Sequence, residues 1–166
     1  MDILVVHASK HGSTAIIAQQ IAAHLVERGH HVTIFDAETA DDLDEAAIAQ
    51  RDAVVIGSAI YAGRWLKPAR RFIDHHAAEL ADTPVWLFSS GPLADDPKPE
   101  DEPIEVRHLE EQLGVRGHRV FNGAIDRSEL NLIERAVVKM IKEPDGDYRH
   151  PEDIRAWTDE IADALV

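Results

Sequence analysis

Short apolar runs alternate with helical patterns along the chain, and this alternation limits the possible fold more than any other feature. Five runs have the residue types and the length of strands, at residues 3–6, 31–36, 53–58, 84–90 and 119–125. Apolar side chains at helical spacing follow them, at 14–27, 43–48, 68 to 76 or 80, 105–113, 129–142 and 154–166. This order predicts an α/β fold, with a parallel sheet, right-handed crossovers and helices on both faces. A length of 166 residues suits a single domain, 1–166.

Polar loops follow three of the predicted strands, at 8–14, 58–65 and 89–93. The carboxyl ends of parallel strands meet at one edge of the sheet, where ligands of such folds bind, so we expect the three loops to form one pocket. The first loop starts a helix at about Thr14, and the free N–H groups and the dipole of a helix start attract anions. We therefore expect a phosphate site in this loop, built from Ser9, Lys10, His11, Gly12, Ser13 and Thr14.

Several phosphate-binding classes do not fit this first loop. A dinucleotide fold requires G-x-G-x-x-G and a P-loop requires G-x-x-x-x-G-K-[ST], but the loop has the single glycine Gly12. A response-regulator receiver has acidic residues after its first strand, whereas Val6-His7-Ala8-Ser9 is neutral there. A small phosphate held by hydroxyl and backbone N–H groups remains.

Composition excludes further classes. A formal charge of −14 opposes binding to nucleic acid and to anionic lipid, and it suits either a salty cytoplasm or general solubility. The absence of cysteine excludes disulfides, thiolate catalysis and Cys-ligated metals. Among the ten histidines, the pairs His30–His31 and His75–His76 are adjacent and point apart, so we expect no metal site. No run approaches the ~20 apolar residues of a membrane span, and no signal peptide is visible, so we expect a cytoplasmic protein.

The chain resembles a known family at several motifs. The loop Ser9 to Thr14 is similar to the T/S-x-T-G-x-T phosphate loop of flavodoxins, with His11 at a position where flavodoxins usually have Thr or another polar residue. Residues 57–65, 67–72, 142–148 and 154–157 resemble flavodoxin-domain proteins of the menaquinone-dependent protoporphyrinogen IX dehydrogenase type. The resemblance covers nearly the whole chain. It implies a flavodoxin-like, doubly wound, five-stranded parallel sheet in the order 2-1-3-4-5, and FMN as the cofactor.

The resemblance also implies a cofactor site. The loop Ser9 to Thr14 would hold the FMN phosphate, and Tyr61 or Trp65 would lie near a ring face, unless these aromatic side chains belong to the core. Gly57 and Gly63 would ease backbone movement beside the flavin. No side chain stands out as a catalytic acid or base, so the flavin would carry the chemistry. The segment bordering the isoalloxazine ring would be Ser58, Ala59, Ile60, Tyr61, Ala62 and Gly63, up to Arg64, and the opposite side would be lined by Ser89, Ser90, Gly91 and Pro92.

Two functions follow from the resemblance. The first is an FMN-dependent oxidoreductase that passes electrons to a quinone or another acceptor, with a porphyrinogen of heme biosynthesis as the family's substrate. Residues 126–135 have mixed charge and no aromatic residue, which disfavours a porphyrinogen and contact with a membrane quinone. The second is an electron carrier whose acidic surface docks on a basic redox partner protein. A scaffold domain that keeps only the fold is a third alternative. The apolar stripe at 130–141 suits the core or the surface of a homodimer.

Overall fold

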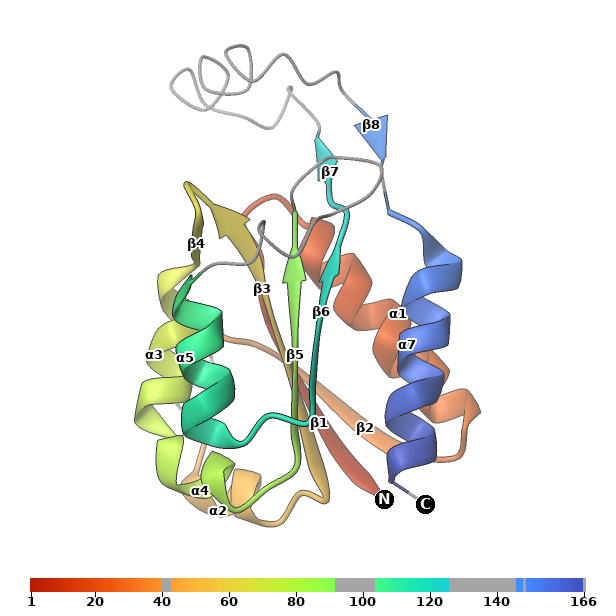
Figure 1. Cartoon of the computed structure of the whole chain (residues 1–166). Coiled ribbons are helices and arrows are strands. Elements are labelled where there is room, and N and C mark those ends of the chain that lie inside the picture. The colour runs from red at the N-terminus through yellow and green to blue at the C-terminus, as the bar shows by residue number, and fades with distance from the viewer. Residues whose placement is uncertain (40–42, 92–103, 126–145, 148, 166) are drawn as a thin grey trace.

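The computed structural model describes residues 1–39, 43–91, 104–125, 146–147 and 149–165. A twisted sheet lies between two layers of helices (Figure 1). The element order confirms the predicted alternation of strands and helices. The elements are β1 (Asp2–Ala8), α1 (Ser13–Glu27), β2 (His31–Asp36), α2 (Glu45–Ala49), β3 (Ala53–Tyr61), β4 (Arg64–Trp65), α3 (Lys67–His75), α4 (Ala77–Ala81), β5 (Val85–Ser90), α5 (Ile104–Leu113), β6 (Gly117–Phe121), β7 (Ala124–Ile125), β8 (Gly146–Asp147) and α7 (Pro151–Ala164).

The main sheet has the order β2-β1-β3-β5-β6, and all four neighbouring pairs are parallel. This confirms the predicted fold class, because these five strands are the five expected ones in the order 2-1-3-4-5. The short strand β4 is an addition that pairs antiparallel with the end of β3. The predicted strand 119–125 is divided, because β6 ends at Phe121 and β7 pairs with β8 in a separate two-stranded sheet.

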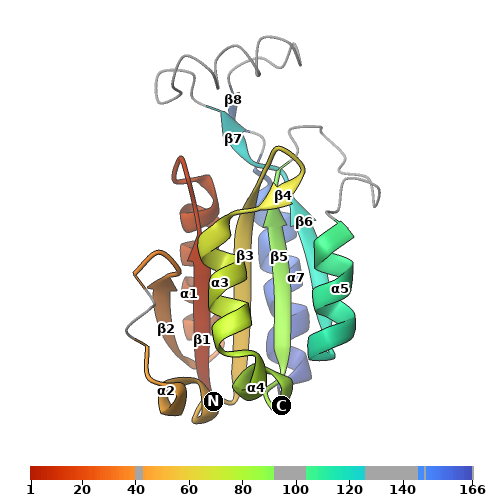
Figure 2. The same ribbon diagram turned by 90° about the vertical axis from the view of Figure 1, so that its left-hand side faces the viewer.

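Each face of the main sheet is covered by its own set of helices (Figures 1 and 2). Successive strand residues point to opposite faces, so the strands contribute to two cores. One core lies under α1 and α7, where the ring of Trp157 packs 5.5 Å from that of Phe121 and 6.3 Å from that of Phe88. The other lies under α3, α4 and α5 and contains Trp65. Both cores come close to the carboxyl edge of the sheet and hold the loops there.

Two of the predicted helices differ from the structure. The helix expected from Pro68 to His76 or Leu80 has the shorter extent, because His76, with φ and ψ of −110° and 23°, leaves the helical region and separates α3 from α4. The last helix begins at Pro151, three residues before the predicted start, and proline suits the first helical turn. The helix expected at 129–142 and the stripe at 130–141 lie outside the described residues. In the described part of the chain, no helix has the length and apolar character needed to span a bilayer.

Three histidines with a buried ring nitrogen make stability depend on pH. Burial lowers the pKa of His7, His30 and His76 below the ordinary value of 6.5, and the Nδ1 atom of each is buried without a hydrogen-bond partner among the described residues. As the pH decreases, the unfolded chain takes up protons at a higher pH than the folded chain does. The free energy of unfolding is therefore highest above about pH 6.5, and it decreases as the pH falls from there through the lowered pKa values. We expect the melting temperature to decrease between pH 7.5 and 5.5.

Thermal unfolding followed by circular dichroism across this range measures the effect. The variant His76→Phe keeps a ring beside Phe72, whose centroid lies 4.9 Å from that of His76, and it cannot be protonated. Its pH dependence should be weaker than that of the unchanged protein. An equally steep loss of stability in this variant would show that His76 does not contribute.

Candidate functional site

The ends of β1, β3, β5 and β6 meet at the carboxyl edge of the sheet, as the three polar loops predicted. The strand order reverses between β1 and β3, which is where ligands bind in sheets of this kind. A methyl group placed on Gly123 would lie 3.4 Å from Ser90 Oγ and 3.7 Å from Ser13 Oγ. A methyl group on Gly91 would lie 3.8 Å from Ile60 Cβ. Segments from all three predicted loops are therefore neighbours.

The first loop has an unsatisfied hydroxyl at an uncapped helix start. Gly12 precedes α1 with a φ of +84°, no side chain caps the helix, and its first turn has no acidic residue. Thr14 is buried in that turn at 1% exposure. The Ser9 Oγ atom is buried and lacks a hydrogen-bond partner among the described residues, which is costly unless a ligand supplies one. Free N–H groups, a helix dipole and a buried hydroxyl together fit a phosphate.

Asn122 is a candidate site residue that was not predicted from the sequence. Its Oδ1 atom is buried and has no hydrogen-bond partner in the described part of the chain, and the residue is 4% exposed. It lies directly after β6 and next to Gly123, which approaches Ser13 and Ser90. The dipeptide Asn122-Gly123 is a turn signal that could have ended the predicted strand 119–125 at Phe121.

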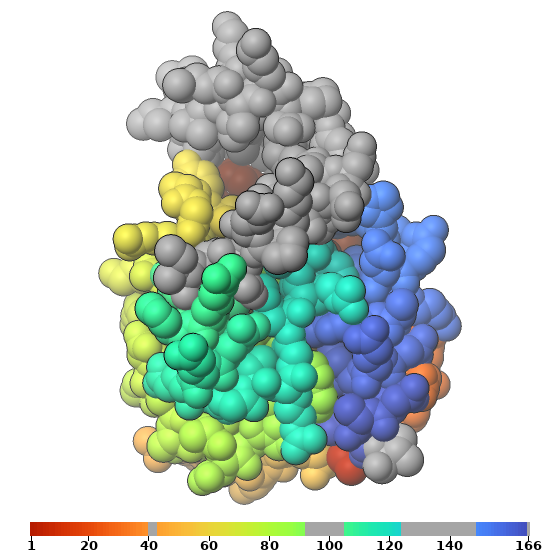
Figure 3. Space-filling view, in the orientation of Figure 1, coloured from red at the N-terminus to blue at the C-terminus, as the bar shows by residue number. Residues whose placement is uncertain are grey.

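The second predicted loop is a β-hairpin, which corrects the expectation of an irregular loop at 58–65. Strand β3 continues to Tyr61, which pairs with Arg64, and Ile60 pairs with Trp65. Ala62 and Gly63 form the turn with φ values of 50° and 73°, the signs that a tight type I′ turn requires. Ser58, Ala59, Ile60 and Tyr61 are thus strand residues. The hairpin forms part of the molecular surface above α3 (yellow in Figure 3).

One contact joins the hairpin to the phosphate loop. The Nζ atom of Lys10 lies 4.0 Å from the centroid of the Tyr61 ring, within the range of a cation–π interaction. Tyr61 is 40% exposed, so the contact is at the rim of the site. His11 is half-buried in the same loop. The first and second predicted segments therefore meet at this rim.

The turn of the hairpin is strained at Ala62, the one non-glycine residue with positive φ in the described part of the chain. A residue with a Cβ atom adopts this conformation only at an energetic cost, whereas glycine adopts it freely. Ala62→Gly is expected to increase the free energy of unfolding by about 0.5–1 kcal/mol, as urea unfolding would measure. Ala23→Gly, at an exposed position inside α1, should instead lower it by about 1 kcal/mol. Destabilisation by both variants would contradict the assigned turn.

Other candidate residues lie below the surface of this edge. Ser58 and Ser89 are 0% exposed, and their hydroxyls bond inside the protein, so a ligand would meet their backbone groups. Trp65 is 1% exposed and belongs to the core. Gly57 lies inside β3 against the ring of Phe88, so its role is packing, which corrects the expectation of local backbone movement.

The third predicted segment leaves the sheet at the end of β5. Ser90 is 5% exposed, and Gly91 has a φ of +104° and donates its N–H to the Phe121 carbonyl at 2.9 Å. Pro92 lies outside the described residues. The described part of the segment is thus held against the end of β6.

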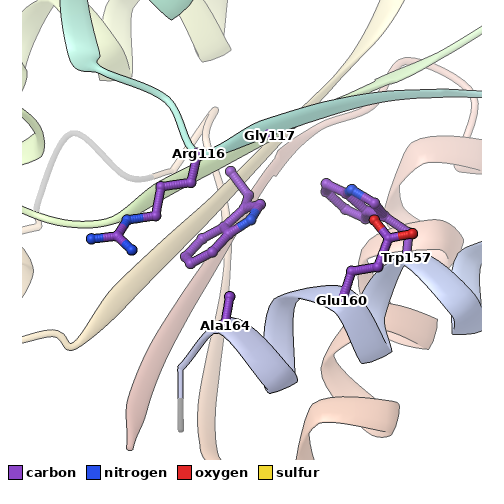
Figure 4. A pocket seen from close by; sticks show the side chains of 6 residues that line it. Arg116, Gly117, Trp157, Glu160 and Ala164 are labelled. Carbon is purple, nitrogen blue, oxygen red and sulfur yellow. The ribbon is translucent and has the colours of Figure 1, made fainter.

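A separate depression lies near the amino ends of β5 and β6, away from these loops. Its volume is about 460 Å³, and Figure 4 shows that Trp157, Glu160 and Ala164 of one helix border it, with Arg116 and Gly117 nearby. It contains none of the predicted site residues. It is lined by Trp86, Arg116, Gly117, Trp157, Glu160 and Ala164.

The fold and the loop geometry define a doubly wound α/β domain with a candidate anion site at the point where strand order reverses. A family model described as "Flavodoxin domain" matches residues 4–152, so the chain belongs to the flavodoxin domain family. Flavodoxins bind FMN, and membership of the family confirms the cofactor predicted from the sequence.

Solved structures agree on the fold. An archaeal flavodoxin has a TM-score of 0.65 at 16% identity, with 99% of each chain covered, and a flavodoxin from Streptococcus pneumoniae gives the same values. The rubredoxin:oxygen oxidoreductase of Desulfovibrio gigas has a TM-score of 0.68 at 13% identity. The match covers 99% of this chain and 36% of that longer one. No curated protein matches the chain in sequence. At these identities the similarity defines the fold alone.

Proposed function

We propose that this domain binds FMN at the carboxyl edge of its sheet and acts as an FMN-dependent oxidoreductase of the protoporphyrinogen dehydrogenase type, passing electrons to a quinone or another acceptor. The observation that carries the proposal is the Ser9 hydroxyl at the start of α1, which is buried without a hydrogen-bond partner among the described residues. Ser9 to Thr14 would hold the ribityl phosphate. The flavin ring would lie between the hairpin, Ser58 to Gly63, and the segment Ser89 to Pro92.

In this arrangement, bound FMN supplies the electron chemistry. The chain's own residues would bind and orient it: the hydroxyls and N–H groups of the first loop would donate hydrogen bonds to the phosphate, and Gly91 brings backbone groups close to the hairpin. Lys10 and Arg64 would set a positive rim beside the ring. Asn122 would complete the floor with a polar group that the protein leaves unpartnered in its described part.

Charge around the hairpin favours an anionic substrate or partner. Although the whole chain has a formal charge of −14, residues 53–73 include four basic residues and no acidic one. Three of them, Arg64, Lys67 and Arg71, are exposed on the hairpin and α3, and Figure 2 shows this side of the molecule. A porphyrinogen, which has several carboxylates, matches this charge. The proposal keeps the cytoplasmic location expected from the sequence.

An electron carrier without its own substrate is the alternative, and the acidic remainder of the surface favours it. A carrier of charge −14 would dock on a basic redox partner, with an association rate that falls steeply as salt increases. The two functions share the FMN site and differ in whether the purified protein turns over a small molecule.

The absorption spectrum of the purified protein is the first test. We expect the visible bands of a flavin, release of FMN on denaturation, and quenching of FMN fluorescence when the apoprotein is reloaded. A colourless protein that leaves FMN fluorescence unchanged would refute the proposal. For a flavin-loaded protein, anaerobic oxidation of a porphyrinogen with a quinone as acceptor supports the enzyme. Absence of turnover, with two well-separated one-electron steps in a potentiometric titration, supports the carrier.

A further inference from the structure

A buried chain of polar side chains lies beneath the hairpin, on the face of the sheet covered by α3 and α5. The Nε1–H group of Trp65 donates a hydrogen bond to Ser89 Oγ at 2.8 Å. Ser89 Oγ lies 3.0 Å from His118 Nε2, and His118 Nδ1 lies 3.7 Å from Glu110 Oε1. Because an indole can only donate, Ser89 accepts from Trp65 and can give its own proton to His118.

The arrangement of serine, histidine and glutamate resembles a nucleophile with its base, but burial excludes that role. Ser89 is 0% exposed, and the indole that bonds to it is itself 1% exposed. No substrate carbonyl can reach the Ser89 hydroxyl in this structure. The side chains therefore hold a structural element in place, and the element that they hold is the returning strand of the hairpin.

Two more hydrogen bonds reach the same point of the chain. The backbone N–H of Trp65 donates to Glu105 Oε1 at 2.6 Å, and that of Leu66 donates to Ser58 Oγ at 2.9 Å. The base of the hairpin is thus fixed by side chains from β3, β5 and α5. Its own ladder consists of two residue pairs, and so short a ladder is not stable alone.

We infer that Glu105 and the Ser89–His118 pair are positioning residues that set the place of the hairpin beside the flavin ring. This inference rests on the proposed FMN site. Glu105 accepts a hydrogen bond from the backbone N–H of Trp65, in the two-residue strand β4. Ser89 accepts a hydrogen bond from the indole of the same residue. Loss of the hydrogen bond to Glu105 or of the one to Ser89 would let the hairpin move relative to Ser90 and Gly91. The hairpin side of the proposed cofactor site would then move too.

The test compares Glu105→Ala, Glu105→Gln and Ser89→Ala. The two alanine variants should bind FMN and riboflavin more weakly by the same factor, about tenfold, because they act on the ring end of the site and not on the phosphate end. Glu105→Gln should restore most of the affinity, since its amide oxygen still accepts from the Trp65 N–H. Equal loss in Glu105→Gln and Glu105→Ala would overturn the inference, because the charge of Glu105 beside Arg70, 3.8 Å away, would then be what matters.

The matched control is Thr83→Val, which removes a hydrogen bond of 2.8 Å to the Glu79 carbonyl at the amino end of β5. It should lower the melting temperature without changing flavin affinity. Wild-type affinity and an unchanged flavin spectrum in Glu105→Ala and Ser89→Ala would also overturn the inference.

A second measurement needs no flavin, so it separates this inference from the proposed function. In the apoprotein, trypsin should cut after Arg64 several-fold faster in Glu105→Ala than in the unchanged protein or in Thr83→Val. An unchanged rate refutes the positioning role even if FMN binds. A faster rate in a protein that does not bind FMN supports the anchoring of the hairpin and refutes the cofactor assignment alone.

Discussion

Gly57→Ala is expected to destabilise the protein by about 3 kcal/mol, the largest effect of any single methyl group that we predict. The added Cβ would lie 1.9 to 2.3 Å from three atoms of the Phe88 ring, far inside van der Waals contact. Phe88 is 0% exposed and packs 6.1 Å from Phe121 and 6.3 Å from Trp157, measured between ring centroids, so it cannot move aside cheaply. Thermal unfolding should show a decrease of roughly 6–12 °C in the melting temperature.

Two variants control this experiment. Gly117→Ala also places a methyl group against a ring, but at 3.2 Å from Trp86 Cδ1, so it should cost only about 1 kcal/mol. Phe88→Leu introduced together with Gly57→Ala should recover part of the loss, because the smaller side chain makes room for the methyl group. If Gly57→Ala unfolds at the same temperature as the unchanged protein, the close packing of β3 against Phe88 is wrong.

Removing two hydroxyls from the phosphate loop should weaken FMN binding about 100-fold or more. In Ser9→Ala combined with Thr14→Val, each lost hydrogen bond to a charged phosphate contributes about 1.5–3 kcal/mol, and about 1.4 kcal/mol is a factor of ten. Ser9 Oγ is buried without a hydrogen-bond partner in the described part of the chain. Removing this hydroxyl should therefore also stabilise the protein without ligand, because a buried unsatisfied polar atom is eliminated. Fluorescence titration of the apoprotein with FMN measures the change.

Riboflavin provides the internal control, because it has the same ring without the phosphate. Its affinity should differ between the unchanged protein and the double variant by no more than roughly twofold. Equal weakening of FMN and riboflavin would show that the variant disturbs the whole site. Unchanged FMN binding would place the phosphate elsewhere, and the assignment of Ser9 and Thr14 would then be wrong.

The fold was predictable because its signals are local. Each strand of the main sheet is a short apolar run, and the start of α1 is marked by a glycine and hydroxyl residues. Gly12 was recognised as part of a phosphate loop because a helix start after a strand attracts anions whatever packs around it. The common edge of the three loops then followed from parallel pairing alone.

The hairpin and its supports were not predictable in the same way. Ala62 has a φ of 50°, a conformation that alanine avoids. Of the two central turn positions, only Gly63 therefore has a residue type that is typical of such a turn. The sequence left Trp65 either as a flavin contact or as a core residue, because its hydrogen bonds are to Ser89 and Glu105, which are distant in sequence. Asn122 was counted within a strand, since residues 119–125 read as one β-rich run. Such contacts arise from tertiary packing, which residue patterns do not reveal.

The small sheet of β7 and β8 has an evolutionary consequence. Ala124 pairs with Asp147 and Ile125 with Gly146, so the residues on either side of 126–145 are joined after the end of β6. Where two strands already join the ends of an insertion, doubling the length of a flexible insertion costs only about 0.6 kcal/mol of loop entropy. The pair of strands can therefore accept segments of different length and chemistry without disturbing the sheet below. An insertion between β7 and β8 would thus change the substrate or partner contacts of this chain while the sheet below stays the same.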